Sequence, residues 1–570
     1  DESWETSHRF MTGYLAVGSG QFGDPAVPPA SWRLPVTPLE PVALEREDGV
    51  LRADFGRETF GYIQLHDVAG HGRVRVQYGE CAQEANDGEH CETYDLLDVA
   101  GADLITIDHS RALRYVTVIP EPQVQIGHVS LLYEALPLAY RGRFRCSNER
   151  VDQIFDLSLY TLHLNTREFF LDGIKRDRWL WSGDAYQSYL MNYYSFFDIP
   201  VTRRTIVALR GKDPVEEHLN TILDYSMYWF MGLYDYYQYT GDLAFVRKLY
   251  PAALRLMEFC AGRANADGLL EGQPGDWVFV DWARMPKEGE LTFEQMVYCL
   301  SLEAIVRFAE LFDDADTVAR YRPLAEHVRR TIREVFWDAE RGVFVHRRVD
   351  GVIDPLVTRH PAMFALLYDF VEPDDRRRLA ETVMTNPDVP AITTPYMRFY
   401  ELAALCEIGQ HAHVLEEVLA YWGGMLALGA TSFWEEYDPR IPIPEQYAMY
   451  GRPYGKSLCH AWGASPIYLF GKYFLGVTPA APGYTATLIE PHLGGLEWIE
   501  GAVPTPDGEV TVFADATTLR VSIPAGTATV RFASSVPPEV SAGTLRETQA
   551  GHYELAIDQP GQVYQVQYAG

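Results

Sequence analysis

The stretch SNERVDQIFDLSLYTLHL, Ser147 to Leu164, marks the point where the sequence changes from strand patterning to helix patterning. Its apolar residues recur three and four positions apart, which predicts a helix with one buried face. That face would carry Val151, Ile154, Phe155, Leu159 and Leu162. Ser147 is the predicted N-cap, because a serine side chain can accept a backbone N–H at a helix start.

Helical periodicity continues over residues 145–477, interrupted by loops rich in glycine and proline. About twelve helices in about 330 residues fit six helical hairpins, which can close into an (α/α)6 barrel. A solenoid is the alternative, but no repeat of about 34 to 47 residues is visible. The clearest helical segments are 185–197, 221–239, 242–263, 290–312, 315–336, 373–386, 396–408, 410–428 and 458–475.

Short β-type runs flank the helical region on both sides. Residues 1–140 contain ETFGYIQLHDV, GRVRVQYGE, LRYVTVIP and VQIGHVSLLYEA, and residues 478–570 contain EVTVFAD, TLRVSIP and ATVRFAS. Such runs, separated by turn residues, are typical of antiparallel sandwiches. The predicted fold is therefore a multidomain α+β protein, with a central (α/α)6 barrel between N-terminal and C-terminal β-sandwich domains.

Composition excludes several classes of partner. The formal net charge of −31 opposes binding to nucleic acid or to an anionic membrane. No apolar run approaches the roughly 18 residues that a membrane-spanning helix needs. Seven scattered cysteines are interpreted as buried thiols rather than as a disulfide framework. Without a CxxC or HExxH pattern, neither a metal nor another cofactor is predicted.

The compartment and the oligomeric state stay open at this stage. The chain begins DESWETSHRF, without an initiator methionine or an apolar signal segment. A removed leader and a trimmed sequence both fit, so a soluble cytoplasmic protein and a secreted or periplasmic one remain alternatives. A homodimer is one of the assemblies that the sequence allows.

Four stretches near predicted helix ends combine tryptophan with ionisable side chains. They are FLDGIKRDRWLWSGDAYQ (170–187), QPGDWVFVDWARMP (273–286), GATSFWEEYDPR (429–440) and SLCHAWGAS (457–465). Any one of them alone would more often be packing plus a helix cap. Together they favour a carbohydrate site, because sugar C–H faces pack on aromatic rings and sugar hydroxyls bind carboxylates. Cleavage of a glycosidic bond typically requires two carboxyl groups.

These stretches, with ADFGRETFGYIQL and VRVQYGE of the N-terminal region, resemble the α-L-rhamnosidases of glycoside hydrolase family 78. The resemblance runs motif by motif across most of the chain. It implies an (α/α)6 barrel between β domains. It also implies a carbohydrate substrate, an L-rhamnoside, and hydrolysis of its terminal α-L-rhamnosyl residue with inversion.

The family's general acid is the Glu of a segment of the form D-x-P-x-R-D-E-R-x-G-W-x-G-D. This chain has DGIKRDRWLWSGD, which is one residue shorter and contains no Glu. Aligned from the shared W-x-G-D end, Trp181 and Asp184 match and the Glu falls on Asp177. The resemblance thus implies Asp177 as general acid. A gap placed elsewhere would instead put Arg178 at that position.

The family's general base is the Glu after Trp, which corresponds to Glu435 in TSFWEEYD. Glu436 is the competitor, and successive side chains diverge, so only one is expected to face the cavity. The remaining residues assigned to substrate binding by the same resemblance are Asp172, Arg176, Trp181, Asp184, Trp277, Trp434 and His460. Arg176 and Lys175 have an alternative role, which is pairing with neighbouring aspartates.

Two other interpretations remain at this stage. One is a different (α/α)6 glycosidase or a sugar phosphorylase that acts on another sugar. The other is an inactive carbohydrate-binding homologue, which the missing Glu would explain. Fold-level analogy does not separate these, because one barrel hosts several chemistries.

Overall fold

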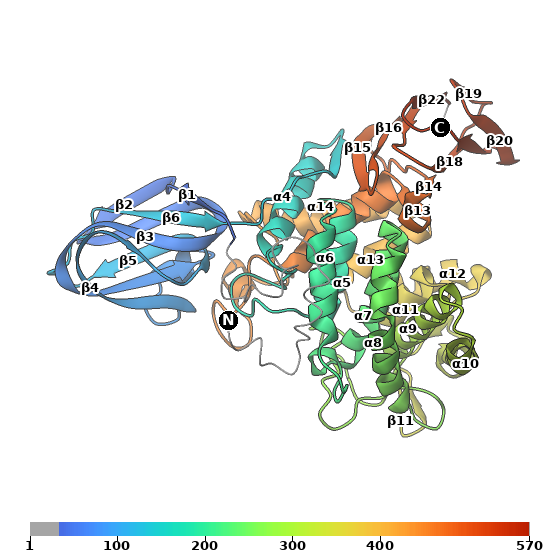
Figure 1. The fold of residues 1–570 in the computed structure, drawn as a ribbon, viewed down its shortest axis with the longest axis horizontal. Coiled ribbons are helices and arrows are strands. Elements are labelled where there is room, and N and C mark those ends of the chain that lie inside the picture. Colours follow the sequence, from blue (N-terminus) through green and yellow to red (C-terminus); the bar gives the residue numbers. More distant parts are fainter. Residues whose placement is uncertain (1–33, 569–570) are drawn as a thin grey trace.

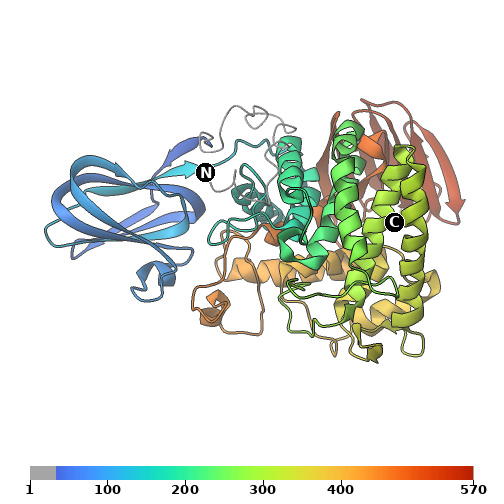
Figure 2. The same ribbon diagram turned by 60° about the horizontal axis from the view of Figure 1, so that its bottom comes forward.

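A computed structural model describes residues 34–568 of the chain, so the sandwich predicted from residue 1 is described only from residue 34. Helices form the middle of the molecule, and strands lie on two different sides of them (Figure 1). The turned view shows the same arrangement, with the N-terminal sheet clear of the helices on one side (Figure 2). The expected multidomain mixture of helix and sheet is confirmed.

The N-terminal strands form one antiparallel sheet around its own apolar core. Two of the predicted runs belong to a single 30-residue strand, β3. This strand bends back on itself, because Val118 of β5 lies opposite both Leu51 and Val76 of β3. The elements are β1 (Val36–Leu39), β2 (Ala43–Glu47), β3 (Val50–Gly79), α3 (Ala82–Asn86), β4 (Thr93–Thr106), β5 (Arg111–Pro120) and β6 (His128–Glu134).

The helices of the middle region contact one another in a repeating order. Helix α5 contacts α7, α7 contacts α9, α9 contacts α11 and α11 contacts α13; α13 contacts η6 and α15, which both contact α5 again. The α-helices are α4 (Glu149–Asn165), α5 (Ser182–Tyr193), α6 (Ile199–Arg210), α7 (Leu223–Thr240), α8 (Leu243–Gly262), α9 (Thr292–Leu311), α10 (Ala315–Phe336), α11 (Arg359–Leu367), α12 (Pro373–Leu379), α13 (Pro395–Glu407), α14 (His411–Ala427) and α15 (Pro466–Leu469).

Short elements complete this region. The single helical turns are η3 (Leu219–Thr221), η4 (Ala380–Met384), η5 (Ile443–Tyr447), η6 (Ala461–Ala464) and η7 (Phe470–Phe474). The short strands are β8 (Glu290–Leu291), β9 (Trp337–Asp338), β10 (Val343–Phe344), β11 (Arg347–Val349) and β12 (Val352–Asp354).

Two local predictions are wrong. The N-cap of α4 is Asn148, whose side chain accepts the N–H of Arg150 at 3.0 Å. The Ser147 hydroxyl instead accepts the N–H of Glu497 from the C-terminal region at 2.9 Å. Residues 458–475 form η6, α15 and η7 rather than one helix. Pro466 lacks the N–H that a continuous helix would use, which favours a break there.

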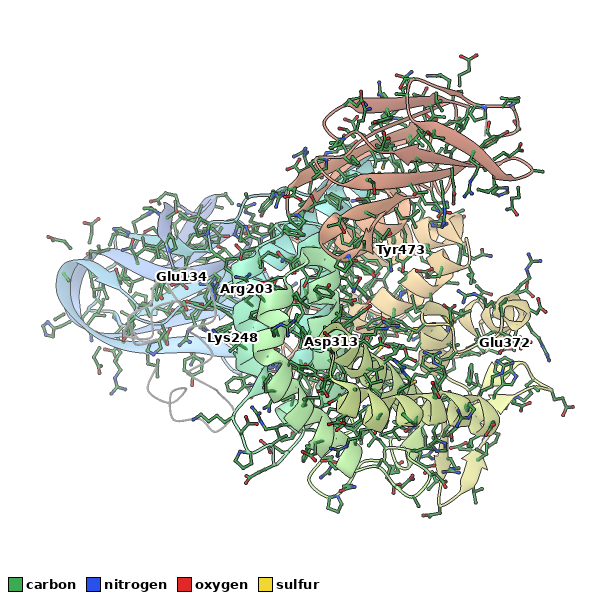
Figure 3. All side chains as sticks on the ribbon, turned by 45° about the vertical axis from the view of Figure 1, so that its right-hand side comes forward. Glu134, Arg203, Lys248, Asp313, Glu372 and Tyr473 are labelled. Carbon is green, nitrogen blue, oxygen red and sulfur yellow. The ribbon has the colours of Figure 1, made fainter. Side chains whose placement is uncertain are left out.

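The C-terminal strands form two sheets, and one of them takes in a strand from far earlier in the chain. That strand, β7 (Arg143–Cys146), precedes α4 and pairs with β15. Tyr473, labelled in Figure 3, lies where the last helical turns meet the red strands. The strands are β13 (Val477–Ala481), β14 (Ala486–Ile489), β15 (Trp498–Thr505), β16 (Gly508–Asp515), β17 (Thr518–Ser522), β18 (Thr527–Ala533), β19 (Glu539–Val540), β20 (Thr544–Gln549), β21 (His552–Ile557) and β22 (Val563–Gln567), with the turn η8 (Pro482–Tyr484).

All seven cysteines are buried free thiols, as predicted. Within residues 34–568, no helix is both long enough and apolar enough to cross a bilayer.

Candidate active site

The segment Asp172–Trp179 is a loop whose two ends are joined by hydrogen bonds. The Asp172 N–H donates to the Trp179 carbonyl at 3.2 Å, and the Trp179 N–H donates to Asp172 Oδ1 at 2.9 Å. Arg178 adopts a left-handed φ of 49°, which is uncommon outside glycine. Its guanidinium lies over the Phe60 ring and donates to the Ser110 carbonyl at 3.0 Å, and both residues belong to the N-terminal domain.

One cavity of about 310 Å³ is lined by this loop, by the other three tryptophan-containing stretches, and by residues of 222–225 and 450–452. Eight of the nine predicted site residues line it: Asp172, Arg176, Asp177, Trp181, Asp184, Trp277, Glu435 and His460. The other lining residues are Ile222, Tyr225, Phe279, Trp282, Tyr450, Arg452 and Trp462. Stretches nearly 300 residues apart in sequence therefore converge on a single site.

Glu435 is the buried carboxylate of this cavity, with a side chain only 3% exposed. Oε2 accepts the Ser457 N–H at 3.0 Å, and Oε1 accepts the Tyr450 hydroxyl at 3.0 Å. Burial raises the pKa of Glu435 above its ordinary value, although the Arg176 cation partly opposes this. Glu436 does not line the cavity and accepts the Thr393 hydroxyl at 2.8 Å, so the two glutamates diverge as expected.

Arg176 connects the two proposed catalytic carboxyls. Its Nη2 lies 3.3 Å from Glu435 Oε2, and its Nε lies 3.3 Å from Asp177 Oδ1. The guanidinium stacks on the Tyr450 ring at 4.6 Å and also donates to the Gly455 carbonyl. Asp177 itself is 43% exposed at the cavity wall. One cation thus fixes both carboxyl groups relative to each other.

Two further carboxyls that line the cavity, Asp172 and Asp184, are also buried. Burial raises the pKa of Asp184 to about 7, although the Tyr225 hydroxyl, which donates to its Oδ2 at 2.9 Å, partly opposes the shift. Burial raises the pKa of Asp172 well above its ordinary value, and the neighbouring Asp184 adds to the shift. A carboxyl that holds its proton can donate a hydrogen bond as well as accept one.

His460 lies beside these carboxyls as a neutral imidazole. Burial lowers its pKa well below the ordinary value, and the Arg176 cation adds to the effect. The ring stacks on Trp462 with centroids 3.9 Å apart, and Nε2 lies 4.0 Å from Asp184 Oδ1. A distance of 4.0 Å is too long for a hydrogen bond, so both groups keep capacity for a ligand hydroxyl.

Aromatic rings form the cavity mouth. Trp181 and Trp277 meet edge to face at 6.1 Å, Trp277 and Trp282 lie 6.1 Å apart, and Trp282 meets Tyr450 at 5.4 Å. Trp277 is 40% exposed, which leaves much of its surface open to a ligand. Trp434 lies outside this group, because it is buried against Tyr437 and Tyr447.

Sequence reasoning overlooked several lining residues. Trp282 and Trp462 stand in stretches that the sequence had already singled out, so the tryptophan pattern could have included them. Tyr450 and Arg452 belong to the loop RIPIPEQYAMYGRPYGK, whose prolines and glycines marked it only as a connection. Tyr225 sits in the first turns of α7, and nothing local separates it from a core tyrosine. Within residues 34–568, no group of three or more His, Cys, Asp or Glu side chains could hold a metal ion.

Three family models match the chain. Residues 1–118 match the alpha-rhamnosidase-like N-terminal domain of bacteroidetes, and residues 476–542 match the bacterial alpha-L-rhamnosidase C-terminal domain. Residues 140–474 match the bacterial alpha-L-rhamnosidase 6 hairpin glycosidase domain. No curated protein matches the chain.

Solved rhamnosidase structures share the fold at low sequence identity. The GH78 rhamnosidase of Bacillus sp. GL1 is 23% identical with a TM-score of 0.73, over 81% of this chain and 50% of that one. The Klebsiella oxytoca rhamnosidase with rhamnose bound is 24% identical with a TM-score of 0.66, over 77% of this chain and 96% of that one. The Streptomyces avermitilis α-L-rhamnosidase complexed with L-rhamnose is 16% identical with a TM-score of 0.72, over 94% of this chain and 54% of that one.

This chain therefore spans only about half the length of the Bacillus and Streptomyces enzymes. The match of the helical-domain model alone nevertheless covers more than half of the 570 residues. The chain belongs to the bacterial α-L-rhamnosidases of glycoside hydrolase family 78.

Proposed function

We propose that this protein hydrolyses terminal α-L-rhamnosyl residues from glycosides or oligosaccharides. The observation that carries the proposal is the pair Asp177 and Glu435, held by one arginine at the wall of an aromatic cavity. Glycoside hydrolysis commonly requires such a pair of carboxyl groups. The Klebsiella structure with rhamnose bound and the Streptomyces structure complexed with L-rhamnose support the choice of sugar.

The proposed mechanism is a single displacement with inversion. Asp177 donates a proton to the glycosidic oxygen as the bond to the anomeric carbon breaks. Glu435 accepts a proton from a water that attacks the opposite face of the sugar ring. Inverting enzymes separate their carboxyls by about 6.5–9.5 Å, which leaves room for that water. The guanidinium of Arg176, lying between the two carboxyls, supports a separation of this kind.

The other lining residues hold the sugar in this proposal. Asp172, Asp184 and His460 form hydrogen bonds with its hydroxyls, and Trp181 and Trp277 pack on its apolar C–H face. The scaffold is a closed (α/α)6 barrel. The contacts that run from α5 through α7, α9, α11 and α13 and return to α5 support closure, and so does the 6 hairpin domain description.

The test is hydrolysis of a panel of aryl glycosides by the native protein and by Asp177→Asn and Glu435→Gln. The panel contains the α-L-rhamnoside, the α-L-arabinoside, the β-D-glucuronide and the α-D-glucoside. We expect turnover of the rhamnoside, lowered roughly 10²- to 10⁴-fold by each substitution because each removes one proton-transfer group. Glu436→Gln is the matched control and keeps native activity, because its carboxylate faces Thr393 outside the cavity.

The same assay separates the alternatives. NMR of the first-formed sugar anomer reads the stereochemistry, and retention would contradict the single displacement. Activity that survives Asp177→Asn would move the proton donor to Asp184, whose pKa of about 7 suits that role. Absence of turnover on every glycoside, combined with tight binding of L-rhamnose, would leave a binding protein instead of an enzyme.

A further inference from the structure

A charged cluster lies behind the cavity, where the N-terminal sheet meets the helical region. Lys175, which precedes Arg176 in the catalytic loop, does not pair with a neighbouring aspartate. Its Nζ lies 2.9 Å from Glu84 Oε2 and 3.4 Å from Glu80 Oε2, and both glutamates belong to the N-terminal domain. All three side chains are buried. A buried lysine requires such partners, because an unpaired buried charge is costly.

Glu80 also reaches the loop that carries the other catalytic carboxyl. Its Oε2 accepts the N–H of Leu458 at 2.6 Å. The residue before Leu458 is Ser457, whose N–H donates to Glu435 Oε2 at 3.0 Å. Lys175 contacts the same stretch, since its Nζ donates to the Tyr454 carbonyl at 2.8 Å. One N-terminal carboxylate therefore touches the loop of Asp177 and the loop of Glu435 together.

We propose that Glu80 is a positioning residue of the N-terminal domain, which sets the distance between the acid-bearing and the base-bearing loops. This inference rests on the proposed function, since it presumes that Asp177 and Glu435 are the reacting groups. Glu80 acts through two neighbours, Lys175 on one loop and Leu458 on the other, and does not line the cavity. Arg178, anchored on Ser110, fixes the far side of the same catalytic loop.

The sequence pattern of the loop agrees with this role. Within Lys-Arg-Asp-Arg, the outer pair, Lys175 and Arg178, contacts the N-terminal domain. The inner pair, Arg176 and Asp177, lines the cavity. The N-terminal domain thus contacts the loop on both sides of its proposed reacting group, Asp177. Displacement of a reacting group by about 1 Å can lower the rate roughly 100-fold.

The experiment compares three substitutions at Glu80 in the full chain. Glu80→Ala removes the acceptor for Leu458 and lowers kcat roughly 10- to 100-fold, while KM changes less than about threefold. Glu80→Gln keeps an acceptor oxygen and restores kcat to within about threefold of native. Glu80→Asp keeps the charge but shortens the reach, so kcat falls in a protein that folds even where the Ala variant does not. The control is Glu47→Ala, an exposed carboxylate of the same domain, which keeps native kcat and KM.

Hydrogen exchange gives a second readout that needs no substrate. In Glu80→Ala, amides in residues 172–181 and 455–462 should exchange faster, while those of β5 and β6 keep native protection. Native kcat in Glu80→Ala, or a Gln variant as impaired as the Ala variant, would overturn the proposal. Absence of turnover by the native protein would refute the proposed function instead, and the exchange pattern would still test the link between the loops.

Discussion

The C-terminal strands join the helices through apolar side chains, whereas the N-terminal sheet meets them through buried charges. Phe144 of β7 stacks on Phe470 of the last helical turns at 4.6 Å, within one apolar cluster that runs from the helices into the C-terminal sheets. The N-terminal sheet keeps a separate core. Its junction contains the Lys175 cluster, an ion pair between Arg167 and Glu134, and a small apolar patch around Phe60. Glu134 is labelled on the N-terminal domain in Figure 3.

This difference separates two kinds of support. Apolar burial is non-directional, so it adds stability without fixing a particular loop geometry. Charged and hydrogen-bonded contacts have defined directions, and breaking one partner leaves the other unsatisfied. On the proposal above, the C-terminal junction stabilises the scaffold, while the N-terminal junction fixes the proposed active-site loops. Substitutions that lower the free energy of unfolding equally should therefore affect activity differently at the C-terminal and N-terminal junctions.

A matched pair of substitutions tests this most strongly. Lys175→Met strands two buried carboxylates and should destabilise by about 3–5 kcal/mol, with kcat roughly 100-fold lower. Phe144→Ala should cost about 3–5 kcal/mol as well, but with kcat and KM unchanged in the folded fraction. Denaturant unfolding measures the free energy of unfolding of each variant, and rhamnoside hydrolysis measures its kcat and KM. A large fall in kcat for Phe144→Ala would break the comparison.

The pH dependence of stability offers a smaller test. Burial raises the pKa of Glu80 from its ordinary 4.5 to about 7, against the opposing effect of Lys175. The folded state thus binds this proton more tightly. The associated stability is fully present below about pH 4.5 and is lost as the pH rises through about 7. Glu80→Gln cannot titrate, so the native protein should lose stability relative to it between about pH 5 and pH 8.

Denaturant unfolding at about pH 5 and about pH 8 measures the difference in unfolding free energy between the native protein and Glu80→Gln. Phe144→Ala is the control, because it changes no titratable group and its offset from native should be the same at both. An offset between native and Glu80→Gln that does not change with pH would contradict the assignment. Glu84 and Glu58 belong to the same cluster, and burial raises the pKa of each. Both residues are present in the native protein and in Glu80→Gln, so they titrate in both proteins compared.

Much of the fold was predictable, because the spacing of apolar residues shows which side chains are buried. That spacing differs between helices and strands. The change of period at Ser147, with the helical segments after it, located α7, α8, α9, α10, α13 and α14 closely, whereas the segment predicted over 185–197 lies a few residues after α5. What failed depended on tertiary context. Strand β7 has no local signal that assigns it to a sheet formed more than 350 residues later. The break within 458–475 is an exception, because Pro466, which begins α15 after η6, is a local signal.

The site was predictable wherever a residue type carries chemistry by itself. Tryptophans beside ionisable side chains singled out four stretches, and the family resemblance then assigned nine residues, eight of which line the cavity. The prediction for Trp434 is wrong because successive side chains diverge, so a tryptophan next to Glu435 points elsewhere when Glu435 faces the cavity. Lys175 was assigned to a neighbouring aspartate because its true partners, Glu80 and Glu84, are about 90 positions away. Long-range ion pairs have no signature in one sequence.

Two partly exposed ion pairs, one beside the cavity and one within the C-terminal sheet, provide the finest comparison. Arg452, at the cavity wall, pairs with Glu92 of the N-terminal domain at 2.6 Å, and Arg143 pairs with Glu509 within the C-terminal sheet at 2.7 Å. Both arginines are about half exposed, so Glu92→Gln and Glu509→Gln should each cost less than about 1 kcal/mol. Glu92→Gln should raise KM about two- to threefold, because it frees an arginine that lines the cavity, whereas Glu509→Gln should leave KM unchanged. Equal KM values for the two variants would mean that the N-terminal junction influences the site only through its buried charges.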